Sequence, residues 1–103
     1  MKDKEEAVLI YLQFPQGTLY SERKLDILLF DVEDVLQEAV EKNKVGTLDG
    51  NEMYEDTITY FFYGKDANKI AEVVYPMLSY IPFMKGSYIL KRYRDDKEKQ
   101  IML

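Results

Sequence analysis

One short stretch, residues 57–63, limits the folds open to this chain more than any other. It reads TITYFFY, four consecutive aromatic residues after three β-branched ones, and both residue types are enriched in strands. Successive side chains of a strand point to opposite faces. The residues therefore divide into two apolar sets: Ile58, Tyr60 and Phe62 on one face, Thr59, Phe61 and Tyr63 on the other. A strand of this kind belongs in the middle of a sheet that is covered, at least partly, on both sides.

A second stretch, residues 7–14, has the same two-faced character. It reads AVLIYLQF, with Val8, Ile10, Leu12 and Phe14 on one face and Leu9 and Tyr11 on the other. A strand whose two faces are both apolar is again expected to be buried. We predict that strands 7–14 and 57–63 both occupy central positions in one sheet.

The first helix is predicted from an apolar stripe between Leu25 and Val40 with the i, i+3, i+4, i+7 spacing. Residues 32–42 fit this pattern best. The start has two interpretations: Ser21 as N-cap of a helix that includes residues 22–30, or Asp31 as N-cap of a shorter helix. Lysine in the last turn and Gly46 just beyond indicate where the helix ends.

The segment that follows the helix contains two candidate turns. Asp49-Gly50 is a type I′ hairpin signal. Glu55-Asp56 is the alternative, and it leaves Asp49-Gly50-Asn51 inside an irregular edge strand. We prefer the second turn because it gives strand 57–63 a partner of matching length.

A second helix is expected after Asp66, which is a good N-cap residue. Its apolar stripe begins at Ile70, and Pro76 inside the stripe should kink the helix or loosen its last turn. Residues 87–93 then form a final strand. Residues 95–103 are expected to be a charged tail beyond an ordered core of about residues 7–94.

The order of elements is β–α–β–β–α–β within a single domain, residues 1–103. Strands interspersed with two helices favour an α+β fold, the ferredoxin-like βαββαβ sandwich, with an antiparallel sheet and both helices on one face. In that topology the first and third strands are the inner pair. These are the two strands that are apolar on both faces.

Composition excludes several kinds of chemistry. The chain has no cysteine and no histidine, so it has no disulfide, no thiolate nucleophile and no imidazole base. A net charge of −5 disfavours nucleic acid as a partner. There is no apolar run near the roughly 20 residues needed to span a bilayer, and the N-terminus does not resemble a signal peptide. We expect a cytoplasmic protein without a cofactor or membrane contact, and a non-enzymatic protein rather than an enzyme.

The candidate binding residues are aromatic side chains that one uncovered sheet face would display. They are Tyr11, Tyr60, Phe61, Tyr63, Tyr88 and Tyr93. Which face is open is not fixed by the alternation. An aromatic sheet face can stack nucleic-acid bases, but the acidic chain lacks the basic, glycine-containing motif of RNA-recognition domains. Self-association or binding to a protein partner fits such a patch better.

The charged residues give weaker signals. Asp49 and Glu52, with Glu55 and Asp56 nearby, are weak candidates for holding a hard cation, but their spacing does not match an EF-hand loop, so we expect no metal site. Lys65 and Lys69 lie beside a helix start with a single glycine, which is too little for a phosphate-binding loop. The basic run at residues 91–94 is interpreted as protection of an edge strand.

Three motifs, in this order, resemble those of a family of small single-domain bacterial proteins of uncharacterised function. They are GTLDGNE at 46–52, YGKDANKI at 63–70 and MKGSYILKRY at 84–93. Lys65 stands where the family pattern has proline, and residues 94–96 replace its Gly-Pro-Pro. The resemblance implies a compact bacterial domain with this strand order, and it transfers no catalytic residue.

The sequence thus favours a non-enzymatic interaction module that regulates or neutralises a partner protein, acting as a homodimer or in a complex with another protein. The alternative is a small-molecule-binding regulatory domain that holds its ligand between the open sheet face and a dimer partner. A carboxylate-dependent hydrolase ranks last, because nothing in the sequence indicates a buried or perturbed carboxylate.

Overall fold

The structure, a computed structural model, describes residues 5–14, 22–80 and 85–103. These residues form, in chain order, β1 (Glu6–Gln13), α1 (Glu22–Lys42), β2 (Thr47–Tyr54), β3 (Thr57–Gly64), α2 (Ala67–Val74), the 3₁₀ helix η2 (Tyr75–Tyr80), β4 (Tyr88–Arg92) and β5 (Glu98–Met102). The proposed cap at Ser21 lies outside the described residues.

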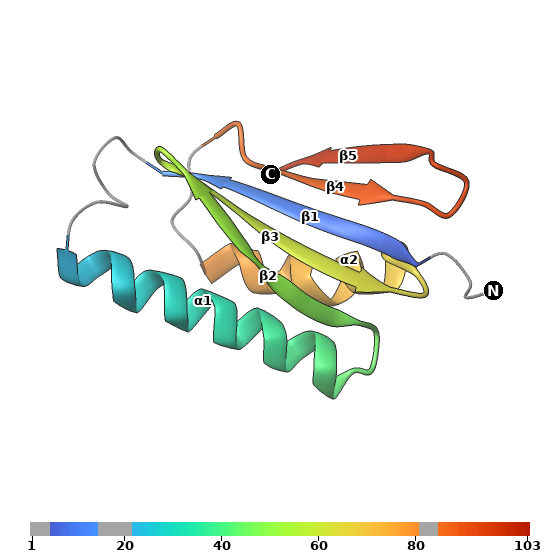
Figure 1. The fold of residues 1–103 in the computed structure, drawn as a ribbon, viewed down its shortest axis with the longest axis horizontal. Helices are drawn as coiled ribbons and strands as arrows, with labels where there is room; N and C mark the ends of the chain where they lie inside the picture. Colours follow the sequence, from blue (N-terminus) through green and yellow to red (C-terminus); the bar gives the residue numbers. More distant parts are fainter. Residues whose placement is uncertain (1–4, 15–21, 81–84) are drawn as a thin grey trace.

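The five strands form one antiparallel sheet in the order β2-β3-β1-β4-β5 (Figure 1). The predicted α+β class, with an antiparallel sheet and two helices, is confirmed. The four-stranded ferredoxin-like sandwich is not matched, because the sheet has a fifth strand that continues it beyond β4. β1 and β3 lie in the interior of the sheet and pair along their whole length, from Glu6 opposite Gly64 to Gln13 opposite Thr57.

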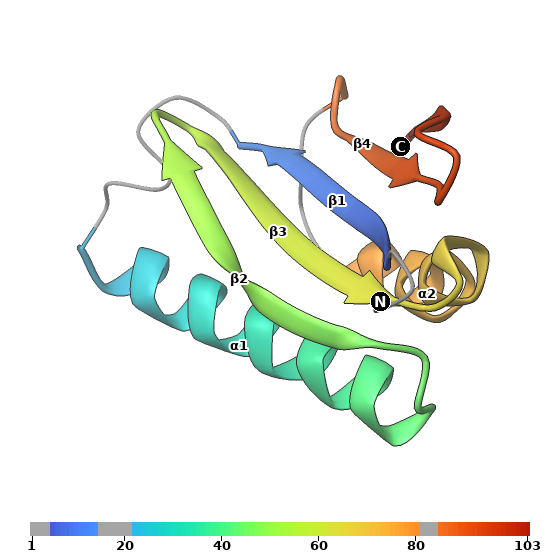
Figure 2. The ribbon, with the colours of Figure 1, turned by 45° about the vertical axis from the view of Figure 1, so that its right-hand side comes forward.

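Both helices lie on the same side of the sheet (Figures 1 and 2). The main hydrophobic core fills the space between the two layers. Its strand residues share one face and include Val8, Ile10, Leu12, Ile58, Tyr60, Phe62 and Ile89. Val32, Leu36 and Val40 from α1, and Ile70 and Val74 from α2, pack against them. Burial of each such side chain contributes roughly 1.5–3 kcal/mol, and this layer is the main source of stability.

Helix α1 runs without interruption from Glu22 to Lys42, which settles the two interpretations in favour of the longer helix. Asp31 lies inside the helix and is not its N-cap. The C-terminus closes with a Schellman motif, in which the N–H of Val45 donates to the carbonyl of Val40 and the N–H of Lys44 to that of Glu41. Lys44, with φ of 55°, takes the left-handed position.

Gly46 has a different role from the helix-ending one expected. A Cβ at this position would lie 2.5 Å from the carbonyl oxygen of Tyr63, and one at Gly64 would meet the carbonyl of Val45. The two glycines therefore let the loop after α1 pass directly against the end of β3. Close approach of two backbones, rather than a positive φ, explains their place in the sequence.

The hairpin β2–β3 turns at Glu55-Asp56, as preferred from the sequence. Asp49-Gly50 lies inside β2, where the register shifts between Leu48 and Gly50, a β-bulge. β2 is one edge of the sheet. The prediction of an irregular edge strand is confirmed.

Helix α2 begins as predicted, because the Asp66 carboxylate accepts hydrogen bonds from the N–H groups of Asn68 and Lys69. The α-helix ends at Val74, and the chain continues as the 3₁₀ helix η2 through Pro76. Proline lacks the N–H that an α-helical turn requires at this point, so the expected loosening is confirmed.

The chain after β4 does not form a charged tail. Residues 98–102 form β5, which pairs with β4 in the register Tyr88 opposite Met102 and Arg92 opposite Glu98. Ile101 and Leu103 pack against the core on the helix side. The apolar end of the chain therefore widens the sheet rather than folding back over its other face.

Candidate functional site

The sheet face that points away from both helices, called the open face below, is the principal candidate surface. No helix or strand in the described parts of the chain lies over it (Figures 1 and 2). At its centre, Leu9 lies in register between Phe61 of β3 and Leu90 of β4. Leu9 is buried, whereas Phe61 and Leu90 are partly exposed. The middle of this face is thus apolar across three neighbouring strands.

A pair of tyrosines extends this apolar centre. Tyr11 of β1 and Tyr88 of β4 are opposite each other, and their rings stack with centroids 4.4 Å apart and planes 25° apart. Burial is the larger cause, and the interaction with Tyr11 the smaller one, of a Tyr88 pKa that is raised above its ordinary value. Tyr63, in register with Ala7, lies on the same face towards the other end of β1. Stacked and flanking aromatic rings present a large, rigid contact surface.

Four of the six predicted aromatic residues therefore come together on the open face: Tyr11, Phe61, Tyr63 and Tyr88. Two were assigned to the wrong face. Tyr60 lies on the helix side of β3 and is only 1% exposed. Burial and the nearby Glu33 carboxylate raise the pKa of its phenol well above the ordinary value.

Tyr93 is the second correction. It lies beyond the end of β4, packs against the helix-side core, and donates a hydrogen bond to Oδ1 of Asn68 over 2.7 Å. Tyr88 and Tyr93 are five residues apart, an odd separation that places side chains on opposite faces of a strand. The alternation therefore already separated these two residues.

Two exposed residues of the open face were missed by the sequence analysis. Met102 of β5, 59% exposed, lies opposite Tyr88. Tyr54 lies opposite Thr57 at the end of the face. Met102 was missed because the charged residues before it indicate a tail, and EKQIM shows no alternation of polar and apolar residues that would predict a strand.

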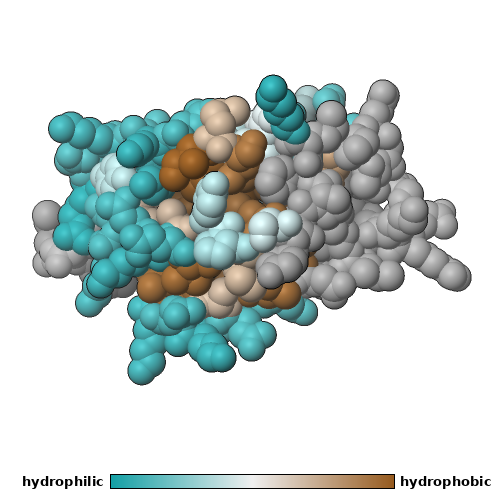
Figure 3. Space-filling model, turned by 180° about the vertical axis from the view of Figure 1, so that it is seen from behind, coloured by the Kyte–Doolittle hydropathy of each residue, from teal (hydrophilic) through white to brown (hydrophobic). Residues whose placement is uncertain are grey.

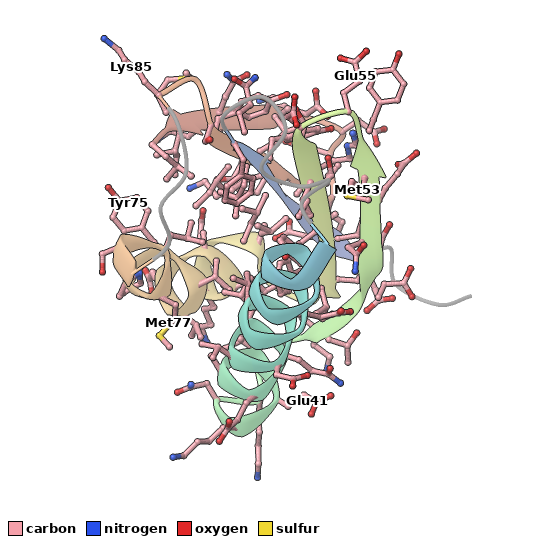
Figure 4. The ribbon with its side chains drawn as sticks, turned by 90° about the vertical axis from the view of Figure 1, so that its left-hand side faces the viewer. Glu41, Met53, Glu55, Tyr75, Met77 and Lys85 are labelled. Carbon is pink, nitrogen blue, oxygen red and sulfur yellow. The ribbon has the colours of Figure 1, made fainter. Side chains whose placement is uncertain are left out.

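The acidic candidates do not assemble into a metal site. Asp49 lies in the bulge of β2, Glu52 lies opposite Thr59, and Glu55 and Asp56 form the hairpin turn (Figure 4 labels Glu55). Within residues 5–14, 22–80 and 85–103, no three metal-ligating side chains gather at one point.

The start of α2 is occupied by the protein's own carboxylates. Asp66 caps the helix, and Glu6 Oε1 accepts the N–H of Ala67 at 2.9 Å while its Oε2 accepts that of Arg94 at 3.0 Å. Arg94 also donates to the carbonyl of Lys65. These bonds tie together three segments of the chain, and they satisfy the N–H groups that an anion would need.

The basic run at residues 91–94 does not protect a sheet edge, because β4 is paired on both sides. Arg92 forms a salt bridge with Glu98 of β5. Lys91 is 9% exposed, and its Nζ donates to Oδ1 of Asn68 at 2.9 Å.

Comparison with protein-family models, curated proteins and solved structures yields no match. Among the described helices, none combines the length and the apolar character needed to cross a bilayer.

Proposed function

We propose that this chain is a non-enzymatic interaction module that binds through its open face, and that the bound protein is a second copy of the chain. The observation that supports the proposal is the continuous row of Phe61, Leu9 and Leu90, with the stacked Tyr11 and Tyr88 beside it. Large side chains of this kind are enriched at the centres of protein interfaces.

A two-fold dimer suits a surface of this shape. Each copy offers the same apolar centre, and in an isologous contact the same patch meets itself. Five strands spaced about 4.8 Å apart give a face on the order of 24 Å wide. Specific interfaces bury about 800 Å² on each partner, which is close to the most that such a face can supply. We therefore expect a dissociation constant in the micromolar range.

The experiment is light scattering of the full chain during gel filtration, from about 5 to 300 μM, a range that brackets the expected micromolar constant. The 12.2 kDa chain should approach twice its mass at the upper end. Tyr88→Glu places a charge in the apolar centre and should abolish dimer formation. The matched control is Tyr75→Glu, because Tyr75 is a half-exposed tyrosine on η2 rather than on the sheet.

Circular dichroism on both variants establishes that each is folded before the masses are compared. A chain of monomer mass at every concentration would disprove the dimer, and so would a dimer that Tyr88→Glu and Tyr75→Glu weaken equally. If the dimer forms, we extend the proposal to a role as regulator or neutraliser of a further partner protein.

A further inference from the structure

A groove runs along the other side of the sheet, between α2–η2 and the β4–β5 hairpin. We call it the α2–β5 groove; it has a volume of about 520 Å³ and is lined by Asn68, Ala71, Glu72, Tyr75, Lys91 and Ile101. Figure 3 looks onto the molecule from the side where α2 lies and shows hydrophobic side chains gathered in the middle of this face. Figure 4 shows Tyr75 projecting outward from η2.

The groove exists because two helices cover a sheet of five strands. α1 packs against β2 and α2, whereas α2 packs against β1, β3 and β4. β5 continues the sheet beyond α2, and its helix-side residues are Lys99 and Ile101. Among the described elements none lies on this side of β5 as a third helix, so the helix layer has room for one more helix beside α2.

One lysine lines the groove and a second lies beside it. Lys91 is a lining residue, and Lys99 is directly opposite Lys91 in the β4–β5 register. Lys91 Nζ uses one donor on Asn68 Oδ1 and lies 5.8 Å from the ring centroid of Tyr93. In the described part of the chain, neither lysine is within 4.0 Å of a carboxylate; the surface ion pairs there join Arg92 to Glu98 and Lys97 to Asp95.

Like charges directly opposite in a sheet disfavour the pairing of the strands. The hydrogen-bond partner of Lys91 is the neutral amide of Asn68 rather than an anion. A ligand that brings a carboxylate to Lys91 and Lys99 would offset the like charges and supply an anionic partner. The groove is therefore suited to an anionic ligand even though the chain as a whole is acidic.

The distribution of charge along the chain points the same way. Residues 22–56, which form α1 and β2, hold eleven acidic and four basic residues. Residues 65–99, which form α2, β4 and the start of β5, hold eight basic and five acidic residues. The groove lies in the basic part of a molecule whose other part is strongly acidic, and that difference orients an incoming acidic segment.

We propose that the α2–β5 groove binds an acidic amphipathic helix of a partner protein. The apolar stripe of this helix lies against Ala71, Tyr75 and Ile101, and its flanking carboxylates contact Lys91 and Lys99. A helix fits because the vacant position is in the helix layer, parallel to the sheet surface and beside α2. The site is on the opposite side of the sheet from the open face, so it does not depend on the proposed dimer.

Glu72 is the one carboxylate among the groove residues. It opposes the binding of an acidic ligand, because a like charge on the α2 wall repels incoming carboxylates. Replacing it with glutamine should therefore strengthen binding, which is the opposite sign from a variant that removes a lysine charge.

The test is a nuclear magnetic resonance titration of the ¹⁵N-labelled full chain with a capped 16-residue peptide of Leu, Ala and Glu. Leucines repeat at i, i+3, i+4 and i+7, with glutamates on either side of the stripe. A matched peptide has glutamine in place of every glutamate. Amide shifts should concentrate at Ala71, Lys91 and Ile101. The glutamate peptide should bind roughly fivefold more tightly, a gain within the range measured for a surface charge pair such as one with Lys99.

Three variants test which charged side chains determine the preference for the glutamate peptide. Lys99→Glu changes an exposed residue, so the fold should survive, and the preference for the glutamate peptide should disappear. Lys85→Glu is the control with the same charge change; Lys85 is exposed, is not a groove residue, and projects outward from the molecule (Figure 4). Glu72→Gln should bind the glutamate peptide more tightly than the unaltered chain.

Equal affinity for the two peptides would overturn the proposal, as would equal losses in Lys99→Glu and Lys85→Glu. Shifts centred on Tyr11 and Phe61 would place the contact on the open face and would also overturn it. An absence of shifts at 2 mM peptide would likewise rule the site out, since a built groove should bind this chemistry at that concentration.

Discussion

The carboxylate of Glu6 accepts a hydrogen bond from the N–H of Ala67 across 61 positions of sequence, at 2.9 Å. Its other oxygen accepts the N–H of Arg94. One side chain at the start of β1 therefore fixes both the first turn of α2 and the entry to the β4–β5 turn. Hydrogen bonds to a charged group are among the stronger ones in proteins.

We expect Glu6→Ala to lower the free energy of unfolding by roughly 1–3 kcal/mol, because it leaves two N–H groups without their acceptor. Glu5→Ala is the matched control, since Glu5 is exposed and precedes the strand. Urea denaturation followed by circular dichroism measures both variants. Equal midpoints for the two would show that the carboxylate of Glu6 has no structural role.

Adjacent phenylalanines in β3 should respond very differently to truncation. Phe62 is fully buried under the helices, so Phe62→Ala should cost about 3–5 kcal/mol. Phe61 is partly exposed on the open face, and Phe61→Ala should cost roughly 1–2 kcal/mol. Chemical denaturation of both variants at low protein concentration checks this difference without interference from association. Small, equal losses would contradict a two-faced strand in the centre of the sheet.

The buried phenol of Tyr60 predicts a loss of stability at alkaline pH. Its pKa in the folded state is above the value near 10 that an unfolded tyrosine has. The contribution of the neutral Tyr60 phenol to the free energy of unfolding is complete below the pKa of the unfolded state. It is lost as pH rises from there towards the folded pKa, because Tyr60 ionises readily only in the unfolded chain.

Thermal unfolding between pH 8 and 11.5 should therefore show a steeper alkaline decline for the unaltered chain than for Tyr60→Phe. Tyr54→Phe serves as the control, because the Tyr54 side chain is largely exposed. Identical slopes for the unaltered chain and Tyr60→Phe would refute the explanation.

Two neighbouring residues of β5 test whether the end of the chain belongs to the fold. Ile101 packs against the helix-side core, whereas Met102 is exposed on the open face. Ile101→Asn should cost about 1–2 kcal/mol from lost apolar burial, and Met102→Asn should change stability by less than about 0.5 kcal/mol. Thermal denaturation distinguishes them, and an Ile101→Asn variant as stable as the unaltered chain would mean that residues 98–103 contribute nothing to the fold.

The sequence predicted the elements whose residues determine their own conformation. Residues 57–63 are β-branched or aromatic throughout, Asp66 is a strong cap, and Pro76 cannot continue an α-helix, so local chemistry decided each of them. The pairing of β1 with β3 was also predictable, because both are apolar on both faces and so require interior positions.

The sequence-based predictions that were wrong or missing share one cause: the interaction that decides the structure is between residues far apart in the chain. β5 contains only two apolar residues, Ile101 and Met102, and it forms because β4 offers a free edge. Tyr60 and Phe61 are both large aromatic residues, so alternation separated them but could not show which face the helices cover. Lys91 became notable only when the register placed it opposite Lys99 and the packing put Asn68 beside it.

The central position of β1 has a consequence for how the chain is made. β1 is synthesised before both of its partners: it pairs with β3, about 50 residues later, and with β4, in which Ala7 lies opposite Arg92. The hairpins β2–β3 and β4–β5 are local and can form as they emerge, but β1 is paired on both sides only after β4 has been made. Pairings of such long range slow folding, and they leave the apolar β1 in need of protection on the ribosome until β4 has emerged.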